Sequence, residues 1–396
     1  MTKKIAAVFV LALAVRWIAF AFFPPRPIAY DDGVSWDGIA VNLAEGKGFT
    51  ENDGSPTSVR PPVYPLFLAG VYKIFGHEPG AARAVQLSLG ALTAVFILLI
   101  GWKVLDEKSG LWAGLLTAVY PPLIVYVTGI GSETLYAFLL VGTVLLFLLA
   151  REKDHPGLYA AAGLALGTAN LCRSTLAFFP FFLIAGAFWL GERGKRLKGL
   201  VFACVLSFLV ILPWTVRNYR VFGGFLLVNI SAGQLFWLGT IEETGGRFVE
   251  LDYPGYRQFD HLSLEKPIEA EREHFRAGLR NIAANPLGFA KLTVVKFFRL
   301  WFEPIGYAMT KERSRAAARI LLAAHAALIF LAGWGLYAGR GRAGSLLVLY
   351  ALFAYFAVMH NLVAPMPRFR LPMEPFIVLF AVHALLNPPR VRKGGL

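Results

Sequence analysis

Three carboxylates occur at positions where a charged group is costly. Asp31 and Asp32 are adjacent in AYDDGVSWDGIAVNLAEGKGF, which follows an almost uninterrupted apolar run. Glu133, in TGIGSETLY, is the only charged residue between Lys108 and Arg151. A carboxylate at a membrane boundary needs a partner or an ion to offset its desolvation. Such a group can remove a proton from an attacking hydroxyl group, so all three are candidate catalytic residues. A solvated turn and a helix-start acid are the alternatives.

Arginines accompany these carboxylates at the ends of apolar runs. They are Arg60 in SVRPPVYP, Arg173 in LCRSTL, Arg217 in PWTVRNYR, and Arg368 and Arg370 in PMPRFRLP. Guanidinium is the side chain best matched to bidentate phosphate binding. We therefore expect these arginines to bind an anionic ligand, for which a lipid-linked phosphate is the natural candidate. Snorkelling to lipid headgroups is the alternative for some of them.

Aromatic residues are dense around the same motifs. Most are expected to belong to the aromatic belts at the membrane interfaces. The remainder could stack on sugar rings, and the candidates for sugar or lipid contacts are Trp36, Tyr64 and Tyr136.

The composition indicates what kind of chain positions these residues. Of the 396 residues, 57% are hydrophobic and only 16% are charged, whereas about a quarter of the residues of an ordinary soluble protein are charged. Nearly uncharged runs of membrane-spanning length recur along the chain. One hydrophobic core cannot explain them, so we expect an all-α integral membrane protein that forms a single transmembrane domain over residues 1–396.

About ten transmembrane helices are expected from these runs. The clearest runs are residues 84–101, 109–127, 134–150, 156–172, 174–191 and 199–216. Less regular runs, each with an ionisable residue, are 5–23, 318–339, 343–361 and 371–388. The first run has no A-x-A-like cleavage site before Pro24 and Pro25, so we expect a retained anchor.

The formal net charge of +14 is explained by membrane topology. Basic clusters lie between the apolar runs, at residues 3–4, 103–108, 151–153, 193–198, 340–342 and 390–393. With a cytoplasmic N-terminus they all fall on the cytoplasmic side, as the positive-inside rule requires. We therefore expect a cell-membrane protein with both termini in the cytoplasm and no nucleic-acid partner. The two cysteines, Cys172 and Cys204, favour neither a disulfide scaffold nor a Cys-ligated metal site.

Two long segments are left on the extracytoplasmic side, residues 24–83 and 217–317. The first is expected to contain two interfacial helices. In SWDGIAVNLAEG, apolar residues recur with helical spacing, with Ser35 as N-cap and Gly46 beyond the end. The second helix, RPPVYPLFLAGVYKIFG, is expected to lie on the surface or to be shallowly re-entrant. The second long segment is expected to be a folded loop, and its residues 286–303 form either a headgroup-facing helix or a further span.

Carboxylates beside phosphate-binding arginines at a membrane surface suit the transfer of a sugar from a lipid phosphate. One carboxylate would remove the acceptor proton as the acceptor attacks the anomeric carbon, while cations stabilise the departing phosphate. This would be a single displacement with inversion. Asp32 and Glu133 are also hard oxygen ligands, so a divalent cation, Mg²⁺ or Mn²⁺, is a possible cofactor.

In these motifs the chain resembles the GT-C membrane glycosyltransferases, in particular the members related to protein O-mannosyltransferases and aminoarabinose transferases. The resemblance lies in DDGVSWDGIAVNLAEGKGF, PTSVRPPVYPLFLAGVYKIFG, QLSLG, SETLY, LCRSTL, PWTVRNYRVFGGF and RFRLPMEP, in that order. It implies a GT-C-like fold and a polyprenyl-phosphate-linked sugar donor. The acceptor, whether a glycolipid, a glycan or a protein, does not follow from it.

The resemblance also implies roles for individual residues. In the family an acidic residue four positions before an aromatic residue is the proposed base or metal ligand; Trp36 occupies the aromatic position, which points to Asp32. Asp31 is then a neighbour or a second ligand, and Glu133 matches the second acidic position. Arg173, Arg217, Arg368 and Arg370 match the basic positions near the donor phosphate. The chain departs from the pattern in having Trp36 where tyrosine is common, and in lacking a large soluble domain.

Two other functions fit the same residues. A transporter or flippase of lipid-linked saccharides would use the arginines to guide a headgroup, but it would need ionisable residues near mid-membrane, where this chain has few. A structural assembly subunit would tolerate the loss of Asp31, Asp32 and Glu133. We therefore expect a glycosyltransferase first and a transporter second.

Overall fold

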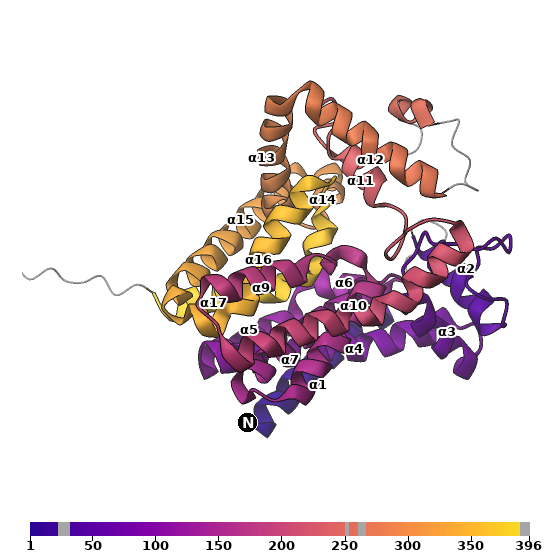
Figure 1. The fold of residues 1–396 in the computed structure, drawn as a ribbon. Coiled ribbons are helices and arrows are strands. Elements are labelled where there is room, and N and C mark those ends of the chain that lie inside the picture. Colours follow the sequence, from indigo (N-terminus) through magenta and orange to yellow (C-terminus); the bar gives the residue numbers. More distant parts are fainter. Residues whose placement is uncertain (23–31, 250–252, 260–266, 389–396) are drawn as a thin grey trace, which may run out of the picture.

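The fold is helical throughout the part of the chain that can be described. A computed structural model describes residues 1–22, 32–249, 253–259 and 267–388. Within these residues there is no strand, and the single β-bridge joins Thr50 to Pro56. Figure 1 shows the long helices packed obliquely side by side, with α12 and α13 above them. Asp31 lies outside the described residues.

The α-helices follow one another with short connections. Their bounds are α1 (Thr2–Phe22), α2 (Gly33–Ala44), α3 (Val63–Phe75), α4 (Pro79–Val104), α5 (Glu107–Val119), α6 (Pro121–Val125), α7 (Glu133–Lys153), α8 (Pro156–Cys172), α9 (Phe179–Trp189), α10 (Gly194–Phe222), α11 (Ala232–Leu238), α12 (Pro267–Ala284), α13 (Pro286–Phe302), α14 (Tyr307–Arg313), α15 (Arg315–Ala338), α16 (Ala343–Leu362) and α17 (Glu374–Leu386). Short 3-10 helices include η2 (Tyr126–Thr128), η3 (Ser174–Leu176) and η6 (Pro367–Met373).

The chain is a multi-pass membrane protein, and every predicted span coincides with helical structure. Six helical stretches of the described residues are long and apolar enough to cross a membrane, or seven if the bent stretch formed by α5, α6 and η2 is one span. The expected number of about ten spans is not confirmed. One reason is that α8, with 17 residues, and α9, with 11, are shorter than these six stretches. Another is that α15 and α16 follow one another in a stretch of 48 residues and are counted once.

Two helix boundaries differ from the sequence prediction. Ser35 is not the N-cap of the first interfacial helix, because α2 begins at Gly33 and Asp32 occupies the N-cap position. The segment that was expected to leave the membrane at residue 217 is still helical there, because α10 continues to Phe222 and ends at Gly223, whose φ of 69° suits glycine. The turn of helix that carries Arg217 is therefore rigid.

The predicted span 109–127 is broken by two prolines. The axis bends by 50° between α5 and α6, where Pro121 and Pro122 follow each other. A proline at position i cannot donate to the carbonyl at i−4, so Pro122 leaves the carbonyl of Ala118 without its helical partner. Arg16 Nη1 donates to that carbonyl at 2.8 Å. The buried arginine of α1 therefore satisfies the backbone at the bend.

Small residues bring the helices close together. A Cβ atom at Gly163 of α8 would lie 2.5 Å from the carbonyl oxygen of Ala203 on α10, and one at Gly167 would lie 2.8 Å from that of Ser207. Helices in lipid associate mainly through such close packing. The α8–α10 pair is therefore fixed by backbone contact.

Turns between helices gather at one end of the bundle, which we call the turn end. Lys4 pairs there with Glu107 at the start of α5, and Arg342 Nη1 donates to the carbonyl of Leu105 at 2.7 Å. Arg151, at the end of α7, pairs with Glu192 after α9. These contacts connect the N-terminus with the turns that follow α4, α7, α9 and α15. Glu133 and Arg173, by contrast, lie at the other ends of α7 and α8.

Candidate functional site

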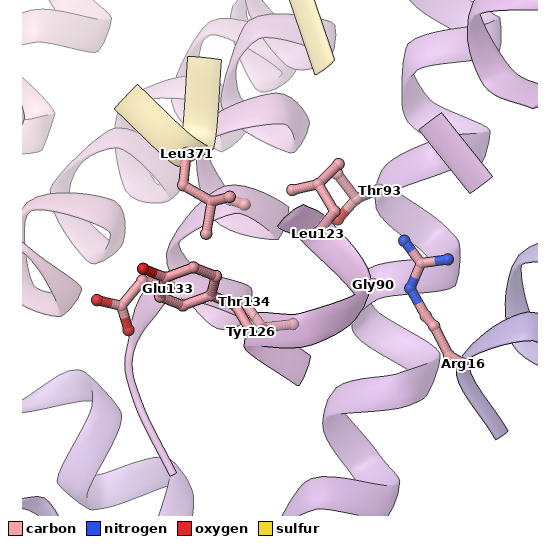
Figure 2. Close-up of a pocket in the computed structure, with 9 residues that line it drawn as sticks. Arg16, Gly90, Thr93, Leu123, Tyr126, Glu133, Thr134 and Leu371 are labelled. Carbon is pink, nitrogen blue, oxygen red and sulfur yellow. The ribbon is translucent and has the colours of Figure 1, made fainter. Parts of the chain in front are cut away.

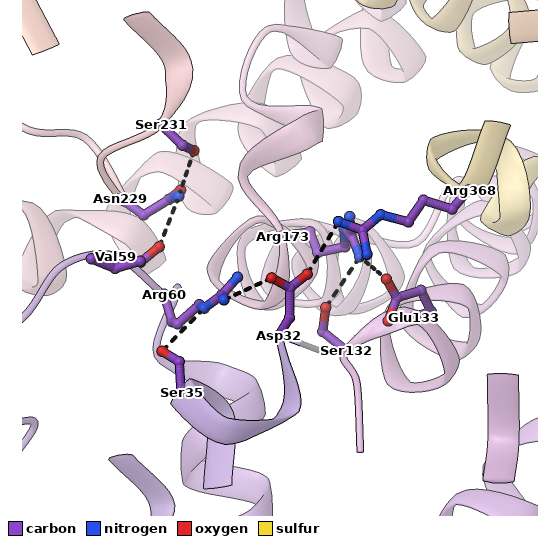
Figure 3. A network of polar contacts seen from close by, with 10 residues as sticks. All are labelled: Asp32, Ser35, Val59, Arg60, Ser132, Glu133, Arg173, Asn229, Ser231 and Arg368. Carbon is purple, nitrogen blue, oxygen red and sulfur yellow. Dashed lines mark hydrogen bonds and ion pairs between the residues drawn. The ribbon is translucent and has the colours of Figure 1, made fainter. Parts of the chain in front are cut away.

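Asp32 lies between two arginines from distant parts of the chain. Its Oδ1 accepts a hydrogen bond from Arg60 Nη2 at 2.9 Å, and its Oδ2 lies 3.1 Å from Arg368 Nη2. Arg60 belongs to the loop before α3, and Arg368 to η6 before α17. Figure 3 shows the two guanidinium groups reaching the carboxylate from opposite sides. The fold therefore joins the first loop to the last helical segment through Asp32.

Glu133 and Arg173 form a second pair beside the first. Glu133 is the first residue of α7, and its Oε1 accepts from Arg173 Nη1 at 2.7 Å. The same nitrogen also lies 3.3 Å from Ser132 Oγ. Arg173 follows α8 directly, so the pair fastens the ends of two adjacent helices (Figure 3). We call Asp32, Glu133, Arg60, Arg173 and Arg368 the arginine–carboxylate cluster.

The cluster has an excess of positive charge. Three guanidinium groups face two carboxylates. Partial burial alone would raise the pKa of Asp32, but the positive charges of Arg60 and Arg368 outweigh it and hold that pKa below its ordinary value. Asp32 is therefore ionised at neutral pH. Its side chain is 37% exposed, and those of Arg60 and Arg368 are 21% and 29% exposed. An anion from solution can therefore reach this part of the cluster.

Arg60 is held by α2 as well as by Asp32. Its Nε lies 3.3 Å from Ser35 Oγ, and its guanidinium carbon lies 5.0 Å from the centre of the Trp36 ring. A cation over an indole face is stabilised by the ring quadrupole. Helix α2 therefore presents Asp32 at its start and supports Arg60 with its first turn.

The aromatic residues predicted to contact sugar or lipid are buried. Trp36, Tyr64 and Tyr136 are 5%, 0% and 1% exposed. Tyr64 O–H donates to Gln86 Oε1 at 2.9 Å, and Tyr136 O–H shares a hydrogen bond with Thr175. Trp36 packs edge-on against Tyr64. The structure therefore places them in the packing beneath the cluster, where they do not reach its surface.

Arg217 and Arg370 do not join the cluster. Arg217, on α10, donates to the carbonyl oxygens of Thr57 and Phe49 at 2.7 and 3.2 Å, and its guanidinium lies over the Trp214 ring. Arg370 has a side chain that is 0% exposed and pairs with Glu374 at 2.7 Å. The prediction that both bind the donor phosphate receives no support from these contacts, because each guanidinium is occupied by protein groups. Arg217 is bonded to the loop between α2 and α3, and Arg370 to the first residue of α17.

Asn229 is a cluster neighbour that the sequence did not suggest. Its Oδ1 accepts from Ser174 Oγ at 2.7 Å, and its Nδ2 donates to Ser231 Oγ at 3.0 Å and lies 3.4 Å from the carbonyl of Val59 (Figure 3). It connects the residue after Arg173 with the residue before Arg60. No charge or spacing signal marks it, because a single asparagine in a loop is common.

A divalent-cation site does not follow from the described residues. No group of three or more His, Cys, Asp or Glu side chains in the described ranges could hold a metal ion. Asp32 and Glu133, the two expected ligands, are instead paired with guanidinium groups. Cations beside a carboxylate oppose metal binding by charge repulsion. We therefore derive no chemical step through a metal.

A small cavity lies behind the cluster. Figure 2 shows Arg16 on one side of it and Glu133 with Thr134 on the other. Its volume is about 10 Å³, which is room for about one water molecule. A Cβ atom at Gly90 would lie 2.7 Å from Arg16 Nε, so glycine makes the space for the arginine. The cavity is too small for a phosphate.

A much larger apolar cavity lies between α13, α15 and α16. It has a volume of about 730 Å³. Its walls are almost entirely apolar and are rich in aromatic rings, including Trp301, Phe330, Trp334, Tyr337 and Phe353. This cavity was not predicted from the sequence, because an apolar or aromatic residue in a span can equally face a cavity, a neighbouring helix or lipid.

Comparison with known proteins identifies the fold. The family model of the dolichyl-phosphate-mannose-protein mannosyltransferases matches residues 59–216. The structure of the oligosaccharyltransferase from Archaeoglobus fulgidus in the apo form matches 96% of this chain with a TM-score of 0.58 and 16% sequence identity. The chain has the fold of the GT-C membrane glycosyltransferases. The resemblance inferred from the sequence motifs is confirmed at this level, and the GT-C fold accounts for the all-helical architecture.

A second oligosaccharyltransferase structure also agrees with the GT-C fold. AglB in complex with an inhibitory peptide and a dolichol-phosphate matches 96% of this chain with a TM-score of 0.56 and 16% identity. Both oligosaccharyltransferase matches cover 50% of the matched chain, so this chain spans about half the length of these relatives. ArnT from Cupriavidus metallidurans, bound to undecaprenyl phosphate, matches 98% of this chain and 78% of its own at 16% identity, but its TM-score of 0.47 is too low to support a conclusion. No curated protein has significant sequence similarity to this chain.

Proposed function

We propose that this protein is a glycosyltransferase that moves a sugar from a polyprenyl-phosphate-linked donor to an acceptor hydroxyl group. The observation that carries the proposal is the position of Asp32 between Arg60 and Arg368, in a cluster with more guanidinium groups than carboxylates. Such a cluster attracts an anion and keeps a carboxylate beside it. The GT-C fold and the mannosyltransferase match support this class of reaction. AglB with a bound dolichol-phosphate supports a lipid-phosphate donor.

The cluster residues divide the chemistry between them. The donor phosphate pairs with Arg60 and Arg368, and this neutralises the charges that lower the pKa of Asp32. Asp32 thereby becomes a stronger base and accepts the proton of the acceptor hydroxyl group. The acceptor oxygen forms a bond to the anomeric carbon as the bond from that carbon to the phosphate oxygen breaks. The electron pair stays on the phosphate, where the guanidinium groups stabilise it, and the configuration at the anomeric carbon is inverted.

The other pair and the apolar cavity complete the proposal. Arg173, held by Glu133, supplies a third cation at the ends of α7 and α8. The cavity between α13, α15 and α16 is large and apolar enough for an isoprenoid chain. Asp31 remains a predicted neighbour or second acidic group of Asp32.

The proposed active site faces the extracytoplasmic side. Basic residues concentrate at the turn end, including Lys103, Arg151, Arg193, Arg340 and Arg342, and basic loops favour the cytoplasm. Single cysteines at Asp53 and Arg193 test the orientation, in a background that lacks Cys172 and Cys204. A membrane-impermeant maleimide added to intact cells should label only the first. Labelling of only the second would reverse the topology.

Turnover by the purified protein tests the activity itself. The protein in lipid nanodiscs is given a panel of radiolabelled polyprenyl-phosphate sugars and a membrane extract as acceptor source. We expect one donor to be consumed, and we expect Asp32→Asn to lower turnover by at least about 100-fold, because a general base contributes about that much. Asp53→Asn is the matched control, since Asp53 is an exposed acid in the same loop that contacts Ser55.

Each outcome has a distinct meaning. Turnover that survives Asp32→Asn would move the base to Asp31 or Glu133. Binding of one donor with no turnover by the parent protein would favour a transporter of lipid-linked saccharides. If the protein neither binds nor turns over any donor of the panel, the proposed lipid-phosphate donor is wrong.

A further inference from the structure

Three consecutive residues of η6 enter three different environments. Arg368 reaches Asp32, with Nη2 3.1 Å from Oδ2. The Phe369 ring lies under the guanidinium carbon of Arg173 at 5.8 Å. Arg370 points into the protein and has an exposed fraction of 0%. The direction of Arg368 therefore depends on what holds the neighbouring backbone.

Arg370 fixes that backbone through a buried network. Its Nε donates to Glu374 Oε1 at 2.7 Å, and Tyr120 O–H donates to Glu374 Oε2 at 2.8 Å. The Nη1 of Arg370 donates to the carbonyl of Leu300, and its Nη2 donates to the carbonyl of Glu303 at 3.2 Å. Three elements meet at the Arg370–Glu374 pair: η6 with α17, the end of α13 through Arg370, and the bend after α5 through Glu374.

Each partner in this network needs the others. The last carbonyls of α13 have no helical donors, and a guanidinium near a helix C-terminus satisfies them and interacts favourably with the dipole. Arg370 and Glu374 are both 0% exposed, so removing one charge would leave the other buried without compensation. These contacts connect η6 and the start of α17 to the end of α13 and to the bend after α5.

We propose that Arg370 and Glu374 are positioning residues that hold η6 so that Arg368 meets Asp32 and the donor phosphate. This inference rests on the proposed function, because the donor phosphate is part of it. Tyr120 contributes by orienting Glu374 from the other side. None of the three touches the donor, which distinguishes them from the arginine–carboxylate cluster.

The turn end offers a matched control for a test. Arg151 pairs there with Glu192 and donates from Nη1 to the carbonyl of Gly344 at 2.7 Å, with a side chain that is 8% exposed. Arg370→Lys and Arg151→Lys each keep the charge and lose a bridging guanidinium. We expect both to lower the melting temperature. Only Arg370→Lys should raise the KM for the donor, by about tenfold, with a smaller change in kcat.

A double-mutant cycle separates positioning from general destabilisation. Because Arg370 acts through Arg368, Arg370→Lys should change the donor KM little further in an Arg368→Gln background. Arg151→Lys should combine additively with Arg368→Gln. Equal effects of Arg370→Lys with and without Arg368 would overturn the proposal. If Arg370→Lys does not fold, Tyr120→Phe serves in the same cycle, because it removes one hydrogen bond and no charge.

Hydrogen exchange tests the positioning without any donor. Arg370→Lys should increase backbone exchange in residues 366–370, and Arg151→Lys should not. Unchanged exchange there would contradict the positioning role even if the enzyme were active. Faster exchange in a protein that uses no donor would keep the network as the holder of η6 and reject the proposed function alone.

Discussion

The molecule uses arginine in two different ways. One group pairs with the cluster carboxylates and remains partly exposed: Arg60, Arg173 and Arg368. The other group bonds to backbone carbonyl oxygens: Arg16, Arg217 and Arg370. A guanidinium on a partly exposed carboxylate can exchange that partner for an incoming anion. A guanidinium that satisfies backbone carbonyls cannot leave without exposing unpaired groups, so the second group holds the scaffold and the first is available for a ligand.

Removing a cluster arginine should have the largest effect on donor binding. Arg368→Gln deletes a charge-assisted contact, which is worth about 1.5–3 kcal/mol, so the donor KM should rise by roughly ten- to a hundredfold. The melting temperature should change little. Titration of the donor against turnover in nanodiscs measures the KM. A KM equal to that of the parent would place Arg368 with the scaffold arginines.

Removing a carbonyl-bound arginine should lower stability and leave donor binding unchanged. Arg217→Gln leaves the carbonyls of Thr57 and Phe49 without their donor, at a cost of about 1–3 kcal/mol of stability. The melting temperature should fall and the donor KM should stay near that of the parent. Arg220→Gln, an exposed change on the same helix, is the control. A raised donor KM at an unchanged melting temperature would return Arg217 to the phosphate-binding group that the sequence suggested.

The pH dependence should reveal the electrostatic coupling within the cluster. Arg60 lowers the pKa of Asp32, so Asp32 stays ionised as the pH falls and activity is lost only when the pH passes below that lowered pKa. Arg60→Gln removes part of the lowering, so the acid limb of kcat/KM should move to higher pH. Lys47→Gln removes a charge that pairs with Glu45 and should leave the limb in place. If the acid limb of kcat/KM stays in place in Arg60→Gln, a group other than Asp32 causes the loss of activity at low pH.

The smallest effect is expected beneath the cluster. Tyr64→Phe removes the hydrogen bond to Gln86, with a cost of about 1 kcal/mol in stability. Donor KM should be unchanged, because Tyr64 is buried and the donor does not reach it. A raised KM would support the sugar or lipid contact that was predicted from the sequence and would show that the packing opens during turnover.

The sequence predicted the helices and most of the cluster for physical reasons. Long apolar runs specify helices in lipid because every backbone group must be satisfied internally. Asp32 and Glu133 were recognisable because acidic residues beside such a run are costly. Sequence could not separate Arg368 from Arg370, because the two residues lie in a 3-10 segment whose side-chain directions depend on packing. The burial of Tyr64 and Tyr136 was equally hidden, since aromatic residues occur in both interfaces and cores.

Helix α12 and the bend after α5 show a different limit. The segment 267–284 is amphipathic, but its many charges suggested a folded loop, and its helix is stabilised by packing on α11, with Phe236 stacked on Phe275. The bend was masked by the apolar character of span 109–127. Pro121 and Pro122 were visible in the sequence. The group that donates to the carbonyl left unpaired by Pro122 was not, because Arg16 is 102 residues from Ala118.

That separation has a consequence for biosynthesis. Helix α1 is made first, and until residue 118 has entered the bilayer Arg16 has only the carbonyl of Ala12, on its own helix, as a partner. A nascent chain that stops before α5 therefore carries a guanidinium in lipid that is not fully satisfied, which is costly. We expect truncated chains of this kind to be retained by the insertion machinery or degraded, and the third predicted span to release the first helix into the bilayer.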